Sequence, residues 1–170
     1  MKEAVLITGF NNWGKTTLIQ NLFGNQTRFW QGYLYIMSGV AFANQFTVET
    51  HSNDDYWGQD WINKIEARIN NSPDNGQYLC TALCPTLHNN NNFIDLLQQP
   101  VFAAYAKLHI FLIEYKWEHH AKLLIPNIIS SGLIDNTNFI TINADQNETN
   151  DDTRWNLKTN QIRDELNQIF

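Results

Sequence analysis

The sequence predicts an α/β fold in which a mostly parallel sheet of five or six strands is sandwiched by helices. Short apolar runs of four to seven residues alternate with longer segments of helical periodicity, a pattern typical of parallel strands joined by helical crossovers. The chain has 170 residues, of which 43% are hydrophobic and 13% aromatic. This is enough apolar surface for the core of one domain, which we expect to span residues 1–170.

The first half of the chain contributes the expected strand Ala4–Thr8 and then a helix over Thr16–Phe23, whose apolar residues share one side. Two β-rich runs, Tyr33–Met37 and Phe46–Thr50, follow. They can form a hairpin, or the first can be an edge strand. Gln59–Asn70 has apolar side chains at helical spacing and predicts an amphipathic helix.

The middle of the chain continues with a strand over Gln77–Leu83, which ends before Pro85. The asparagines of Asn89–Asn92 predict a loop that caps the next helix. That helix is expected to begin near Phe93 and to be interrupted at Pro100, because proline removes a helical hydrogen bond.

The last third opens with Leu108–Glu114, the most apolar of the expected strands and one we place inside the sheet. A helix is expected over His119–Ile125, broken by the proline that follows. Phe139–Asn143 predicts a further strand. A final helix is expected with Asp151 or Asp152 as its N-cap.

Composition excludes several classes of function. The net charge is −6, and there are only 11 Lys and Arg residues, so the chain lacks the cationic surface typical of nucleic-acid binders. No apolar run approaches the roughly 18 residues of a membrane span. Cys80 and Cys84 lie on one expected strand about 13 Å apart, too far for a disulfide. Free thiols indicate a reducing compartment, and we expect a cytoplasmic protein with no membrane partner.

One motif points to a ligand. Residues 9–17 read Gly-Phe-Asn-Asn-Trp-Gly-Lys-Thr-Thr, which fits G-x-x-x-x-G-K-[ST] between an expected strand and an expected helix. Glycines let the backbone curl so that its N–H groups point at phosphate oxygens, and the helix start adds further donors. Lys15 is expected at the β- and γ-phosphates, and the Thr16 hydroxyl at a bridging Mg²⁺. The expected nucleotide-binding residues are Gly9, Asn11, Asn12, Trp13, Gly14, Lys15, Thr16 and Thr17.

Through this loop the chain resembles the P-loop NTPase superfamily. The resemblance implies a doubly wound α/β sandwich that binds a Mg-nucleotide at the carboxyl ends of its strands, and we expect ATP with Mg²⁺ as this ligand. It covers under a tenth of the chain and leaves the activity open. Trp13 departs from the small residues common at that place, and it either covers the nucleotide or a partner or packs against the protein itself.

A second metal ligand is expected at the end of another strand. Glu114 closes an apolar strand and looks like a Walker B acid, although an ordinary solvent-facing carboxylate is the alternative. The adjacent His119 and His120 point about 100° apart on a helix, so one metal could hardly take both, and we prefer helix-start polarity for them.

The segment after the strand that ends near residue 50 reads Asn53-Asp54-Asp55-Tyr56. It is similar to the acceptor-site segment of uridine-kinase-like and other nucleoside kinases. That resemblance implies that Asp54 or Asp55 binds an acceptor hydroxyl and removes its proton. A turn and helix cap is the alternative interpretation. We expect a kinase that phosphorylates a small acceptor such as a nucleoside.

The scarcity of arginine supports an alternative function. No arginine lies between Arg68 and Arg154, where small-molecule kinases of this type usually carry lid arginines. Lys116, Lys122, Arg154 or a partner's arginine could substitute, and otherwise the chain is a regulatory ATPase or a nucleotide-binding module completed by a partner. No N-K-x-D sequence follows a late strand, which disfavours a GTPase. The sequence leaves the acceptor, the base preference and the oligomeric state open.

Overall fold

The computed structural model describes residues 1–116, 122–130 and 135–170, and it shows an α/β architecture. The main sheet has six strands in the order β2-β3-β4-β1-β7-β8, and all neighbouring pairs are parallel except β2 with β3. A second sheet is the small hairpin of β5 (Leu87–His88) and β6 (Asn91–Asn92). The expected fold class is confirmed at this level.

Strand β1 (Glu3–Thr8) lies inside the sheet between β4 (Tyr78–Leu83) and β7 (Lys107–Ile113). All three strands are buried beyond their first residue. Strands covered on both faces read as continuous apolar runs, which is why the sequence marks them clearly. Because the three strands are parallel, their carboxyl ends meet at one edge of the sheet.

The flanks of the sheet differ in character. On one side β3 (Gln45–Glu49) runs parallel to β4, and the two-residue strand β2 (Tyr35–Ile36) pairs antiparallel with β3 as the edge strand. The hairpin and edge-strand interpretations of this region are therefore both correct. At the opposite edge lies β8 (Thr137–Ile142), whose residues are mostly half-buried.

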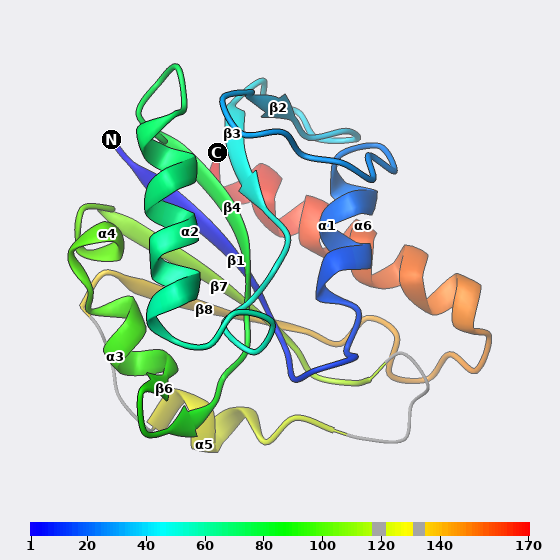
Figure 1. The fold of residues 1–170 in the computed structure, drawn as a ribbon. Coiled ribbons are helices and arrows are strands. Elements are labelled where there is room, and N and C mark those ends of the chain that lie inside the picture. The colour runs from blue at the N-terminus through cyan, green and yellow to red at the C-terminus, as the bar shows by residue number, and fades with distance from the viewer. Residues whose placement is uncertain (117–121, 131–134) are drawn as a thin grey trace.

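Helices cover both faces of the sheet (Figure 1). One face carries α1 (Lys15–Leu22) and α6 (Asp151–Ile169), which contact each other. The other carries α2 (Gln59–Asn70), α3 (Phe93–Leu97) and α4 (Pro100–Ala103). As expected, Asn92 caps α3, and Pro100 separates α3 from α4 by taking the first helical position of the latter.

Two details of the helices differ from the sequence expectation. Residues 122–124 are not helical, and α5 (Ile125–Ser130) instead begins there with Pro126 in its first turn, where a missing N–H costs nothing. Residues 117–121 of the expected helix lie outside the described residues. The N-cap of α6 is Asn150, whose side chain accepts from the Thr153 N–H, while Asp151 and Asp152 occupy the first turn.

Within the described ranges, no helix combines the length and apolarity that crossing a membrane requires.

Candidate functional site

The loop that joins β1 to α1 wraps around a small cavity. Asn12 and Gly14 both adopt left-handed backbone angles, with φ of 59° and 80°. The turn is closed by the Trp13 N–H, which donates to the Phe10 carbonyl at 3.2 Å. The cavity has a volume of about 200 Å³ and is lined by Asn11, Asn12, Trp13, Gly14, Lys15, Thr16 and Asp55. All the loop residues from Asn11 to Thr16 that the sequence assigns to a nucleotide thus surround one hollow, while Gly9 is buried at the end of β1.

Lys15 is the buried cation of this site, with only 7% of its side chain exposed. Its ammonium donates to the carbonyl oxygens of Gly9 and Phe10, at 2.9 and 3.0 Å. The same nitrogen lies 3.6 Å from a carboxylate oxygen of Asp54. The ammonium is therefore folded over the loop, where an incoming anion could exchange with these neutral carbonyl acceptors.

Thr16 and Thr17 are exposed at the first turn of α1. The Thr16 hydroxyl donates to the Thr50 carbonyl at 3.1 Å, so it ties the start of α1 to the segment after β3. This places the expected metal-binding hydroxyl at the rim of the cavity.

Asp54 and Asp55 come from that segment and face the loop. Asp55 lines the cavity, and Asp54 pairs with Lys15. Ser52 holds both carboxylates: its hydroxyl donates to Asp54, and its backbone N–H donates to Asp55 at 2.8 Å. The structure thus brings together the two parts of the site that the sequence separates by almost forty residues.

Cys84, directly after β4, is a further neighbour of this group. Burial, and then the Asp54 carboxylate, raise the pKa of Cys84 to about 12. The thiol is free, as is that of Cys80, and it stays protonated at neutral pH. It therefore adds no charge beside Lys15 and Asp54.

Asn53 is a structural residue that the sequence analysis did not single out. Its fully buried amide pairs with both backbone groups of Cys84, accepting from the N–H at 2.7 Å and donating to the carbonyl at 3.1 Å. It also donates to Asn91 at 2.9 Å, and Asn91 donates back to the Asn53 carbonyl. These bonds fix the segment after β3 against the end of β4 and the β5–β6 hairpin.

Glu49 anchors the same segment at the end of β3. Its carboxylate, only 3% exposed, is 2.9 Å from the Arg68 guanidinium and accepts from the His51 backbone N–H at 3.0 Å. The His51 ring lies 2.7 Å away. Burial alone would raise the pKa of Glu49, but the hydrogen bonds from His51 and the charge of Arg68 outweigh burial and lower it.

Glu114, the expected Walker B acid, engages another partner. Its carboxylate is 3.0 Å from the Lys122 ammonium, while its backbone pairs with Ile142 and Leu123. Glu114 and Thr16 have no hydrogen bond to each other in the described part of the chain, so a metal site that uses both stays a prediction. His119 and His120 lie outside the described residues.

Two tryptophan side chains pack within or against the loop of residues 9–17. Trp13 is only 6% exposed and packs edge-on against Phe10, with ring centroids 5.8 Å apart. Trp13 thus packs against the protein itself, and it also lines the loop cavity, so contact with a nucleotide stays a prediction. Trp155 of α6 lies directly against Gly14, where any Cβ would collide with its indole ring. The second glycine of the loop is thus required both by its φ and by this contact.

Arg154, the nearest candidate for a catalytic arginine, is buried in a different cluster. It is 1% exposed and reaches Asp145 at 2.6 Å, and Lys158 lies 3.0 Å from the same carboxylate oxygen. A further bond joins Arg154 to the Lys116 carbonyl. Desolvation lowers the pKa of the buried Lys158. These contacts hold the ends of β7 and β8 against α6, and they do not present Arg154 to the loop cavity.

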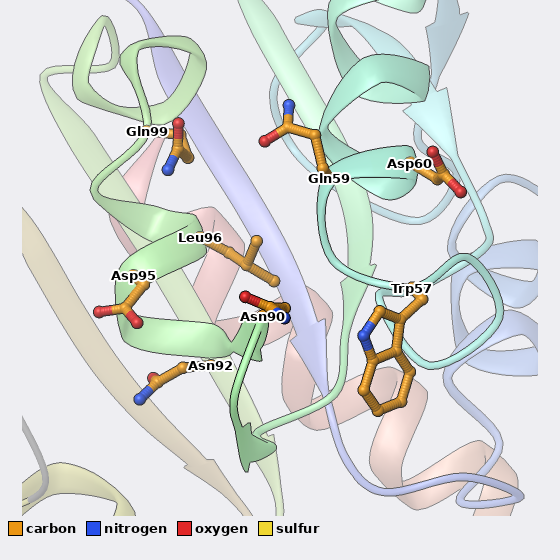
Figure 2. Close-up of a pocket in the computed structure, with 8 residues that line it drawn as sticks. All are labelled: Trp57, Gln59, Asp60, Asn90, Asn92, Asp95, Leu96 and Gln99. Carbon is orange, nitrogen blue, oxygen red and sulfur yellow. The ribbon is translucent and has the colours of Figure 1, made fainter.

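A larger cavity, of about 560 Å³, opens between α2, α3 and the β5–β6 hairpin (Figure 2). Its lining is polar and shared between the start of α2, the hairpin and α3. The lining residues are Trp57, Gln59, Asp60, Asn90, Asn92, Asp95, Leu96 and Gln99. No local sequence pattern marks this cavity, because its walls come from segments about thirty residues apart.

Comparisons with protein-family models, with curated proteins and with solved structures found no match to this chain.

Proposed function

We propose that this chain is a cytoplasmic P-loop protein that binds Mg-ATP at residues 9–17 and transfers a phosphoryl group to a small hydroxyl-bearing acceptor. The observation that carries the proposal is the contact between Lys15 of the loop and Asp54 of the segment after β3. A phosphate-binding cation and a potential proton acceptor meet at the carboxyl edge of a parallel sheet, which is where open α/β sheets bind ligands.

The backbone, the lysine and the glycines of the loop have different roles in the proposed binding of the nucleotide. The backbone N–H groups of the curled loop and of the first turn of α1 bind phosphate oxygens. Lys15 exchanges its two carbonyl acceptors for the β- and γ-phosphates, which are stronger acceptors because they are charged. Gly14, with its positive φ, lets the loop curl and lets Trp155 pack against it, while a Cβ at Gly9 would crowd the Cβ of Trp13.

Few of the described residues could bind Mg²⁺, and the proposal uses two of them. No group of three or more His, Cys, Asp or Glu that could hold a metal gathers in the described ranges. Mg²⁺ usually binds few protein ligands and completes its shell with phosphates and water, so the exposed Thr16 hydroxyl fits it, with Glu114 acting through water once Lys122 has moved. The ion would supply neutralisation of the phosphate charge.

The transfer step places a proton on this chain. The acceptor oxygen forms a bond to the γ-phosphorus, while the bond from that phosphorus to the β–γ bridging oxygen breaks and ADP leaves. The acceptor proton passes to the carboxylate of Asp54 or Asp55. Lys15 lies 3.6 Å from a carboxylate oxygen of Asp54, and this contact keeps the carboxylate beside the loop.

A regulatory ATPase or a nucleotide-binding module completed by a partner is the second candidate. One observation favours it: Arg154 is buried with Asp145, and no other arginine lies between Arg68 and Arg154. Charge on the transferred group would then be stabilised by lysine alone or by a group from a partner.

Replacing the proposed base separates the candidates. We expect Asp54→Asn to lower phosphoryl transfer to an acceptor by about 10²- to 10⁴-fold while ATP binding persists, because the amide cannot take the proton. Transfer is measured with radiolabelled ATP and a panel of nucleosides, and Asp74→Asn, in the turn after α2, is the control. Free phosphate without phosphorylated acceptor would favour the ATPase, and an unchanged transfer rate in both Asp54→Asn and Asp55→Asn would refute the assigned base.

A further inference from the structure

One segment of chain links the cavity of about 560 Å³ to the loop cavity, because each cavity is lined by a residue of that segment. Residues 52–58 run from the loop cavity, which Asp55 lines, to the larger cavity, which Trp57 lines. At Gly58 this segment touches the hairpin so closely that a Cβ would collide with the Asn90 carbonyl. The bonds between Asn53 and Asn91 hold the same two walls together. The segment of residues 52–58 is therefore held in place, and a molecule in the larger cavity would lie against this segment on the way to the loop.

Four of the side chains that line this cavity are amides. Gln59, Asn90, Asn92 and Gln99 line it, and each amide offers both donors and an acceptor. Gln59 and Asn92 use only one end of the amide, toward Asn63 and the Ile94 N–H. The side chains of Asn90 and Gln99 make no hydrogen bond to any described residue. Groups that donate and accept side by side are complementary to the edge of a nucleobase or a similar heterocycle.

An exposed aromatic ring adds a stacking surface. Trp57 is 55% exposed, and its indole is stacked with the His88 ring at a centroid distance of 6.2 Å and an interplanar angle of 29°. Figure 2 shows Trp57 at the side of the cavity opposite Asp95 and Asn92. Aromatic side chains that bind nucleic-acid bases stack on the flat faces of the bases, and every base offers such a face.

The charge of the lining is negative. None of the described residues that line the cavity is Lys, Arg or His, whereas Asp60 and Asp95 contribute carboxylates. These lie at opposite rims in Figure 2, in the first turns of α2 and α3. A phosphorylated or carboxylate-bearing ligand would meet two like charges and no cation to pair with. The lining therefore discriminates against anions.

We propose that this cavity is the acceptor site and takes an uncharged molecule with a planar heterocycle and a free hydroxyl, such as a nucleoside, and rejects the corresponding monophosphate. The inference rests on the proposed phosphoryl transfer, whose acceptor it specifies. The volume lies within the 300–1,000 Å³ common for small-molecule sites. Leu96 and Trp57 provide apolar contact, and the amides provide orientation.

The test is calorimetric titration of the full chain with the common nucleosides and, separately, with their 5′-monophosphates, each with and without a non-hydrolysable ATP analogue and Mg²⁺. At least one nucleoside is expected to bind more than about tenfold more tightly than its monophosphate, since two carboxylates repel the phosphate. Equal or tighter binding of every monophosphate, or no nucleoside binding up to millimolar concentration, would overturn the inference.

Two sets of variants locate the binding. Trp57→Ala is expected to weaken nucleoside binding at least tenfold, and the matched control Trp30→Ala, which also removes an exposed indole, to leave it unchanged. The double variant Asp60→Asn/Asp95→Asn keeps the shape of the lining and should reduce the preference over the monophosphate. A nucleoside that binds Trp57→Ala as tightly as the unaltered chain, or an unchanged preference in the double variant, would contradict the assignment.

Failure of this inference is distinguishable from failure of the proposed function. If the ATP analogue binds and nucleosides do not, the acceptor assignment is wrong and nucleotide binding stands. If the ATP analogue does not bind, the proposed function is wrong, and the titrations without it still decide whether the cavity takes an uncharged heterocycle.

Discussion

At the scale of single residues, the site depends on charges whose partners come from distant parts of the chain. Lys15 and Asp54 are an example, because they form an ion pair and the side chains of both are largely buried. Solvent weakens the attraction within a buried ion pair only slightly, and removing one partner leaves the other charge uncompensated. In the proposed complex, a triphosphate would replace the neutral carbonyls around Lys15, and its charged oxygens would be stronger acceptors than these carbonyls.

Glu49 gives a prediction about pH. The pKa of Glu49 is lowered from its ordinary value of 4.5 by the contacts with His51 and Arg68, so its stabilising effect is complete above pH 4.5 and is lost as the pH falls through the lowered pKa. Glu49→Gln should lower the free energy of unfolding at pH 7 by about 2 kcal/mol, as charged hydrogen bonds are lost. Urea denaturation between pH 7 and pH 3 measures this.

The difference between the Glu49→Gln variant and the unaltered chain should narrow below pH 4.5, because protonation removes the same charge from the unaltered chain. Glu66→Gln, on the exposed side of α2, is the control and should leave the pH profile unchanged. A constant difference across the whole range would show that Glu49 does not stabilise the fold through its charge.

At the scale of elements, the positions of the two cavities depend on the contact between the segment after β3 and the β5–β6 hairpin. We call this contact the seam. Gly58 has φ 49° and ψ −106° and lies against the Asn90 carbonyl. We expect Gly58→Ala to lower the free energy of unfolding by about 1–3 kcal/mol more than Gly24→Ala, where φ is also positive but the nearest atoms leave room for a methyl group. Chemical denaturation of the two variants makes the comparison.

The seam also links stability to ligand binding. Displacing Asn90 would shift one wall of the 560 Å³ cavity, so the Gly58→Ala variant should lose acceptor affinity while retaining affinity for ATP at the loop. If the two glycine substitutions lowered the free energy of unfolding equally, the hairpin would be able to move away from a methyl group at residue 58 at no cost in stability.

At the scale of the whole molecule, the sequence predicts the sheet, the order of its elements and the glycine-containing loop before α1, because each has a local pattern. Buried parallel strands are apolar throughout, and the loop is a contiguous stretch of nine residues. The contact between Asp54 and Lys15 of the loop is a finding of the structure, whereas the role of Asp54 or Asp55 as a base, which the resemblance to kinases implies, stays a prediction.

What the sequence could not predict depends on contacts between distant segments. Asn53 looks like any turn residue, and only its bonds to Cys84 and Asn91, 31 and 38 residues away, show its role. Glu114 has the strand-end position of a metal ligand, but its pairing with Lys122 depends on the path of the chain after β7. Arg154 has the sequence position of an exposed helix start, and the fold buries it against Asp145.

We propose that residues 9–17 bind Mg-ATP, and calorimetric titration of ATP with Mg²⁺ into the unaltered chain and into Lys15→Ala measures this binding. We expect saturable 1:1 binding to the unaltered chain and a loss of affinity of at least tenfold in Lys15→Ala, with Lys64→Ala on α2 as an unaffected control, because Lys15 is the lysine among the described residues that line the loop cavity. No binding by the unaltered chain, or equal affinity in Lys15→Ala, would contradict the proposal.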